Sequence, residues 1–133
     1  MTIIVRDDGF HPEDWLHGFG APDSGATRAL DLAPGSDPAP LAEGLAGVEI
    51  IRIAFPSFSD GRGFTLARRL RRMGFAGRLR AHGHVLADQY TMARRAGFDE
   101  VEITPELAAR QPEADWLARA QWGRLDYRAR LHG

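Results

Sequence analysis

Residues 48–64 read VEIIRIAFPSFSDGRGF, and this stretch decides the fold class. Its first half, residues 48–55, is β-branched and mostly apolar, which predicts a strand covered on both faces. Its second half contains proline, serine, aspartate and glycine, which predicts a loop before an arginine-rich helix. A strand, a loop and a helix in this order form the place where α/β proteins usually bind ligands. The stretch therefore locates a candidate site but names no reaction.

The pattern continues towards the C-terminus with a second strand and helix. Apolar residues at helical spacing occur twice, and Gly74 and Gly97 are the expected C-caps of the two helices. The expected elements are a helix over 63–73, a strand over 78–81, a helix over 85–96 and a strand over 100–103. Residues 48–104 thus read β-α-β-α-β, which predicts parallel strands joined by right-handed crossovers. We expect an α/β fold with a small, mainly parallel sheet and helices on both faces.

The flanking segments carry weaker signals. We expect an edge strand over 2–6, a loop-rich segment over 7–25, a short strand over 26–32, a short helix over 41–46 and a last helix over 113–124, with a frayed tail from about residue 125. An N-terminal strand pair would extend the edge of the sheet. A length of 133 residues predicts one domain over residues 1–133.

Composition excludes several kinds of chemistry. The chain has no cysteine, so thiolate nucleophiles and cysteine-ligated metal or iron–sulfur sites are excluded. All 17 basic residues are arginine, which excludes a Schiff-base lysine and a P-loop lysine. No apolar run is long enough to span a membrane, and the N-terminus lacks the pattern of a secretion signal. We therefore expect a cytoplasmic protein with no membrane contact and no bound cofactor.

Charge is distributed unevenly along the chain. Residues 61–95 contain nine arginines and one acid and carry a net charge of +8, while the rest of the chain carries −9. The arginines of the first crossover helix either form a solvated surface or dock an acidic redox partner. These are Arg68, Arg69, Arg71 and Arg72. Nucleic-acid binding is not expected, because no recognition motif or aromatic platform accompanies the arginines.

The carboxyl ends of parallel strands share one edge of a sheet, so the loops that follow the strands should meet there. The three loops are residues 56–62, 82–84 and 104–105. Both crossover helices begin at this edge with unpaired N–H groups. We expect an anion pocket in which Arg62 and Arg80 are the cations and Ser59 and Gly61 form the loop.

The acids and histidines near this edge each have two interpretations. Asp60 either caps the helix or acts as an acid/base, and Asp88 is either an acid/base or the partner of a nearby arginine. His82 and His84 with Asp88 have a spacing that a metal site could use, but we favour a pair of loop histidines in which His84 caps the next helix, because no third histidine lies nearby. We predict no metal site.

Several short segments resemble the bacterial domain-of-unknown-function family 934. They are FPSFSDGRGF at 55–64, RA at 80–81, DQ at 88–89 and RAGFD at 95–99, and the resemblance covers about residues 50–100. Members of that family are often labelled oxidoreductases and usually occur beside sulfite reductase and phosphoadenylyl-sulfate reductase. The resemblance therefore implies a role in bacterial sulfur assimilation. The chain departs from the family pattern at His84, where an aspartate is usual, and at Ala96, where a cysteine is common.

Three hypotheses follow from these observations. The first is an accessory protein that docks sulfite reductase or another sulfur-assimilation reductase and binds a small sulfur oxyanion at the strand-edge loops. The alternative is a small enzyme, an oxidoreductase acting on an anionic substrate, in which Asp60 or Asp88 is catalytic. The third is a homodimer that acts through an exposed apolar patch.

Overall fold

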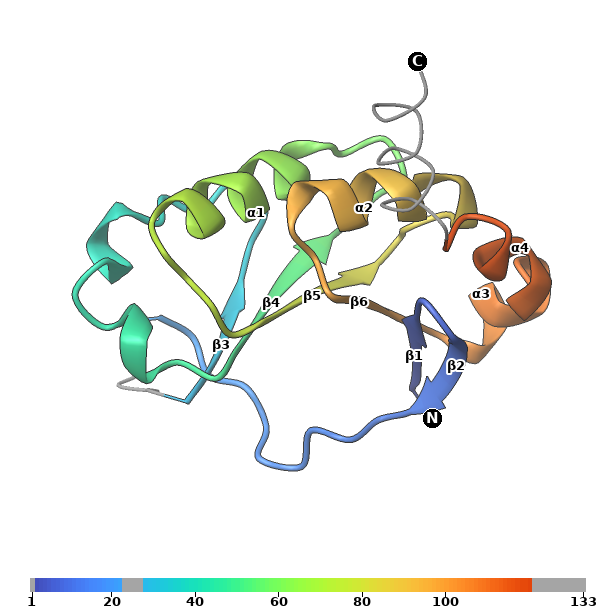
Figure 1. Ribbon diagram of the computed structural model, residues 1–133, viewed down its shortest axis with the longest axis horizontal. Coiled ribbons are helices and arrows are strands. Elements are labelled where there is room, and N and C mark those ends of the chain that lie inside the picture. The colour runs from blue at the N-terminus through green and yellow to red at the C-terminus, as the bar shows by residue number, and fades with distance from the viewer. Residues whose placement is uncertain (1, 23–27, 121–133) are drawn as a thin grey trace, which may run out of the picture.

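The computed structural model describes residues 2–22 and 28–120. They form one six-stranded sheet in the order β2-β1-β6-β5-β4-β3 (Figure 1). The strands are β1 (Ile3–Arg6), β2 (Gly9–Pro12), β3 (Ala29–Leu32), β4 (Ile50–Phe55), β5 (Arg78–Gly83) and β6 (Glu100–Ile103). Strands β3 to β6 run parallel, while β1 is antiparallel to both β6 and β2. The expected mainly parallel α/β sheet, with an N-terminal strand pair at its edge, is confirmed.

The described residues also form four α-helices and three short 3-10 helices, which lie between the strands or follow β6. They are α1 (Arg62–Arg72), α2 (Tyr90–Ala96), α3 (Pro105–Arg110), α4 (Glu113–Leu117), η1 (Ala39–Leu41), η2 (Leu45–Gly47) and η3 (Ala87–Gln89). Helices α1 and α2 pack side by side over one face of the sheet (Figure 1). This corrects the expectation of helices on both faces. Because β4, β5 and β6 are added in the same direction, right-handed crossovers place both helices on the same side.

The hydrophobic core lies between these two helices and the sheet. Alternate residues of β4 point into it, namely Ile51, Ile53 and Phe55, and all three are buried. Phe64 of α1 and Phe98, which precedes β6, pack against the ring of Phe55. Burial of these large side chains on one face fixes the register of the strands.

The opposite face of the sheet carries charged side chains. We call it the polar face and define it by Arg6, Asp31, Arg52, Arg78, Arg80, His82, Glu100 and Glu102, which alternate with the core residues of β1 and β3 to β6. No helix within the described residues covers this face. Residues 13–20, here called the strap, run beneath it between β2 and β3 (Figure 1). A mostly parallel sheet with one charged face is unusual, because such sheets are generally apolar on both faces.

The remaining differences from the sequence-based expectations lie in short elements. Residues 9–12 form β2 and not a loop. Residues 105–110 form α3, and Thr104 caps its first turn by accepting a hydrogen bond from the Leu107 amide. The 3-10 helices η1 and η2 replace the helix expected over 41–46. The segment expected to form one helix over 85–96 forms η3 followed by α2. Helix α4 ends at Leu117. The tail expected to fray from residue 125 lies outside the described residues.

Among the described residues, no helix combines the length and the apolar character needed to cross a membrane.

Candidate functional site

The loops that follow β4 and β5 lie side by side, as the sequence predicts. The amide of His84 donates a hydrogen bond to the carbonyl of Phe55 at 2.9 Å, and the ring of Phe58 stacks on His84 with centroids 4.9 Å apart. Gln89 at the end of η3 donates to the carbonyl of Phe58 at 3.0 Å. Gly83 has φ +109°, and a Cβ there would lie 2.6 Å from the Phe55 carbonyl oxygen. We call these two loops, residues 56–61 and 83–86, the rim.

Arg62 lies at the start of α1, beside the rim, and is exposed to solvent. Its guanidinium binds Asp60 through two contacts, Nε to Oδ1 at 3.0 Å and Nη2 to Oδ2 at 2.7 Å. Asp60 also accepts the Arg62 amide at 3.1 Å, and the side-chain hydrogen bond from Arg62 lowers the pKa of the Asp60 carboxyl. Gly61 is the residue before the helix, and Ser59 shares a hydrogen bond with Ser57 at 3.1 Å.

A small cleft opens along the flank of α1 next to Arg62. It has a volume of about 230 Å³ and is lined by Pro34, Gly35, Ser36, Arg62, Thr65, Leu66 and Arg69. Arg69 contributes a second guanidinium, which contacts the exposed carboxylate of Asp37 at 3.4 Å. We call this hollow the α1 cleft. Two arginines and two hydroxyl side chains make it a suitable environment for a small anion.

Arg80 does not reach the rim. Its side chain points to the polar face, where it has no exposed surface. It donates to Glu13 (Nη1 to Oε2, 2.6 Å; Nη2 to Oε1, 2.9 Å), to Glu100 (2.7 Å) and to Glu102 (2.8 Å). The structure therefore brings Ser59, Gly61 and Arg62 together but places Arg80 on the other side of the sheet.

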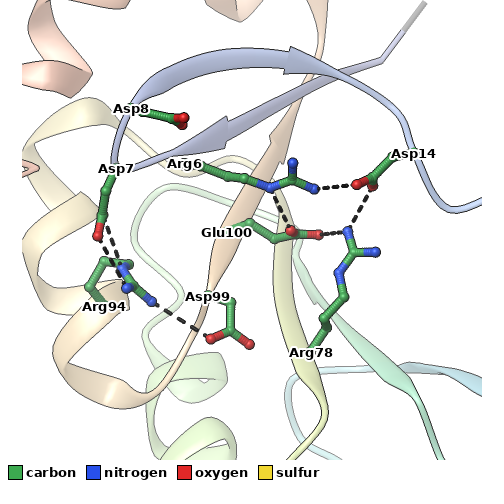
Figure 2. A pocket seen from close by; sticks show the side chains of 8 residues that line it. All are labelled: Arg6, Asp7, Asp8, Asp14, Arg78, Arg94, Asp99 and Glu100. Atoms are coloured by element: carbon green, nitrogen blue, oxygen red, sulfur yellow. Dashed lines mark hydrogen bonds and ion pairs between the residues drawn. The ribbon is translucent and has the colours of Figure 1, made fainter.

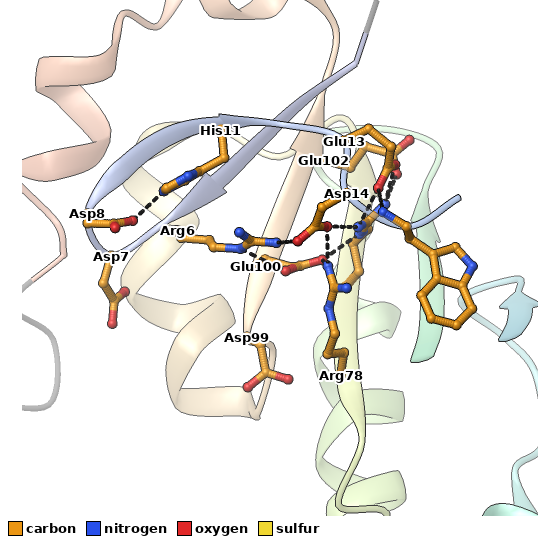
Figure 3. A network of polar contacts seen from close by, with 12 residues as sticks. Arg6, Asp7, Asp8, His11, Glu13, Asp14, Arg78, Asp99, Glu100 and Glu102 are labelled. Atoms are coloured by element: carbon orange, nitrogen blue, oxygen red, sulfur yellow. Dashed lines mark hydrogen bonds and ion pairs between the residues drawn. The ribbon is translucent and has the colours of Figure 1, made fainter. Parts of the chain in front are cut away.

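The contacts of Arg80 belong to a larger network of ion pairs (Figure 3). Glu100 is 2 % exposed and also accepts from Arg6 at 3.1 Å and from Arg78 at 2.7 Å. Asp14 of the strap accepts from the same two arginines, at 2.7 Å from Arg6 and 2.8 Å from Arg78. Although partial burial of Asp14 opposes its ionisation, these hydrogen bonds lower its pKa to about 2. Glu13 accepts hydrogen bonds from Arg80, and these lower the pKa of its carboxyl although its partial burial opposes ionisation.

The network continues across the sheet, through Arg52 of β4, to Asp31 of β3 at the far edge. Arg52 donates to Asp31 at 2.7 and 3.0 Å and to Glu102 at 3.2 Å. The ring of Phe19, from the strap, lies 4.0 Å from the Arg52 guanidinium. His82 lies 3.6 Å from Asp31, and burial, followed by the charge of Arg52, lowers its pKa. Paired charges therefore extend across the polar face from β1 through β6, β5 and β4 to β3.

Asp88 and the two histidines are not assembled into one site. Asp88 is exposed on η3 and pairs with Arg119 at 3.0 Å. His82 belongs to the polar face, whereas His84 stacks on Phe58 at the rim. Within residues 2–22 and 28–120, no three metal-ligating side chains cluster closely enough to hold an ion.

The arginines of α1 differ in what they contact. Arg71 turns inward and donates to the carbonyls of Phe75, Gly77 and Gly97 and to Asp99, so it ties α1 to the loops beside it. Arg68 and Arg72 are exposed and make no hydrogen bond or ion pair with a described residue. Of the four arginines expected to dock a partner, Arg71 serves the fold, and Arg68, Arg69 and Arg72 remain at the surface.

Another hollow, of about 530 Å³, lies at the opposite edge of the sheet, where β5 and β6 begin (Figure 2). Its lining consists of Arg6, Asp7, Asp8, Asp14, Arg78, Arg94, Asp99 and Glu100. Arg94 pairs with Asp7 at 3.1 Å and lies 3.8 Å from Asp99. Sequence reasoning missed this hollow because its residues come from five separate segments.

Comparison with known families identifies the chain. The family profile described as "Bacterial protein of unknown function (DUF934)" matches residues 29–123. A comparison with curated proteins gave no match. The matched region includes β3 to β6, α1 and α2, and it begins after β1, β2 and the strap. Because the match covers more than half of the sequence, the chain belongs to the DUF934 family of bacterial proteins.

Proposed function

We propose that the protein is a cytoplasmic accessory protein of bacterial assimilatory sulfite reduction. In this role it docks an acidic surface of sulfite reductase, or of another sulfur-assimilation reductase, through the exposed face of α1. Membership of the family supports the pathway, because relatives usually occur beside these reductases. The observation that supports docking is that Arg68 and Arg72 are exposed and have no partner among the described residues. Unpaired surface cations steer and orient an acidic partner without first breaking internal ion pairs.

The state of the two candidate catalytic acids favours docking over catalysis. A general acid or base works best when its pKa lies near the operating pH. Asp60 is instead held as a carboxylate by Arg62, and its pKa is lowered. Asp88 is exposed, pairs with Arg119 and does not line the α1 cleft. Both carboxylates are thus engaged in ion pairs, which supports docking over catalysis.

The first test is binding to sulfite reductase from the same bacterium. We expect Arg68→Glu to weaken binding at least tenfold at low salt, because it replaces an attractive charge with a repulsive one. Isothermal titration at two salt concentrations measures this, and binding of the unchanged protein should weaken as salt rises. Arg110→Glu is the matched control, since Arg110 is an exposed arginine on α3. Equal losses for the two variants, or no binding of the unchanged protein, would contradict docking through α1.

The α1 cleft is the part of the proposal that concerns a sulfur oxyanion. We expect sulfite to bind there, with Arg62 and Arg69 as cations, and Arg62→Ala to weaken that binding about tenfold, the loss typical of one charge-assisted hydrogen bond. Sulfite titration followed by NMR shifts of the Ser36 and Thr65 amides measures it. Arg72→Ala, outside the cleft, should leave the titration unchanged. Identical sulfite titrations of Arg62→Ala and the unchanged protein would remove the oxyanion from the proposal and leave docking intact.

A further inference from the structure

The polar face holds a buried cation whose strongest contact comes from outside the sheet. Arg80 lies on β5, a central strand, and has no exposed surface. Two of its nitrogens bind the two oxygens of Glu13, at 2.6 and 2.9 Å. This parallel pair of contacts is the geometry in which a guanidinium recognises carboxylate, sulfate or phosphate. Glu13 belongs to the strap, so the anion in this position is supplied by a separate segment.

The charge balance of the polar face depends on the strap. Excluding His82, the sheet itself contributes four cations, Arg6, Arg52, Arg78 and Arg80, and three carboxylates, Asp31, Glu100 and Glu102. The strap adds the carboxylates of Glu13 and Asp14. The sheet alone therefore has an excess of positive charge, and an external anion could replace the strap carboxylate on Arg80 without leaving that arginine unpaired.

Residues 13–19 of the strap are held mainly by polar contacts, among them those of Glu13 and Asp14. Leu16 is 83 % exposed, and neither Trp15 nor Phe19 belongs to the hydrophobic core. The end of the strap is fixed by its backbone, because the Gly20 amide donates to the Ala29 carbonyl at 3.0 Å. Displacing residues 13–19 would therefore expose the polar face and leave the core between the sheet and its two covering helices in place. The strap also lies outside residues 29–123, which match the family, whereas Arg80 lies inside them.

We propose that the polar face contains a binding site for a small oxyanion, which Glu13 occupies in this structure, and that such a ligand binds Arg80 by displacing Glu13. The ligand must present two oxygens side by side, as carboxylates and tetrahedral oxyanions do. This site is separate from the α1 cleft, which lies beside α1 and next to the rim, and it does not depend on docking to a reductase. The strap is thus an internal competitor that limits access to the site.

The direct test removes the competitor. Glu13→Ala should bind formate or sulfate at least tenfold more tightly than the unchanged protein in isothermal titrations at constant ionic strength. Glu49→Ala is the matched control, because it removes a surface carboxylate that pairs with Arg28 and leaves the pair of Glu13 with Arg80 intact. Tighter formate binding identifies a carboxylate as the preferred ligand, and tighter sulfate binding identifies a tetrahedral oxyanion. If Glu13→Ala binds neither ion more tightly than Glu49→Ala does, the proposal is wrong.

A second measurement uses the unchanged protein and does not require the variant to fold. The Trp15 amide donates to Glu13 at 2.8 Å, so displacement of Glu13 should release it. Hydrogen exchange of this amide should accelerate at least threefold in sulfate or formate relative to chloride at the same ionic strength. The Leu79 amide, on the sheet and bound to Asp99, should not change. Equal exchange of the Trp15 amide in all three salts would overturn the proposal.

Discussion

Replacing Arg80 with alanine is expected to lower the free energy of unfolding by about 3–5 kcal/mol, the cost of removing one partner from a buried ion pair. Glu100 is 2 % exposed and would lose one of its three arginine contacts, while Glu102 and Glu13 would each lose a contact shorter than 3 Å. Desolvated carboxylates without a matching cation are the source of the loss. Urea denaturation followed by circular dichroism measures it.

Two further variants separate the charge effect from the loss of packing. Arg68→Ala removes an exposed arginine without a described partner, and it should change the free energy of unfolding by less than about 0.5 kcal/mol. Arg80→Ala combined with Glu100→Gln should recover part of the loss, because the buried carboxylate is then neutral. A loss of less than about 1 kcal/mol for Arg80→Ala would mean that the polar face is hydrated and that its ion pairs contribute little.

The β-α-β-α-β order could be predicted from the sequence because its signals are local. A run of β-branched residues marks β4, helical spacing marks α1, and glycines with positive φ end α1 and α2. The rim could be predicted as well, since the strands that precede its loops are parallel. In each case a short window of sequence contains the pattern that decides the structure.

The position of Arg80 is also encoded in the sequence, in the alternation of polar and apolar residues along its strand. In β5, arginine and histidine alternate with Leu79 and Ala81, and in β6 glutamate alternates with Val101 and Ile103. Alternation of this kind indicates one apolar and one polar face, which is incompatible with helices on both faces. The place of Arg80 near the end of its strand predicts a position at the rim, but its alternation with Leu79 and Ala81 puts it on the polar face.

The strap could not be predicted. Glu13 and Arg80 are 67 residues apart, and no local pattern connects them. Glycine, proline and aspartate correctly mark residues 13–22 as irregular, but they carry no information on which surface the segment covers. Residues 9–12 form β2 because β1 offers an unpaired edge, which is a tertiary effect.

Replacing Trp116 with alanine is the second change with a large expected effect, a loss of about 3–5 kcal/mol in the free energy of unfolding. Trp116 has no exposed surface, packs edge-on against Tyr90, and donates its ring N–H to the Gln111 carbonyl at 2.8 Å. Gln111 in turn accepts the amide of Ala87 in η3, so the cavity would loosen the element that positions Gln89 under the rim. Thermal and urea denaturation measure the loss. The control is Leu117→Ala, because the neighbouring Leu117 is 41 % exposed, and this change should alter the free energy of unfolding by less than about 1 kcal/mol. Similar losses for the two variants would show that α4 contributes to the core as a whole and that Trp116 has no special part in holding η3.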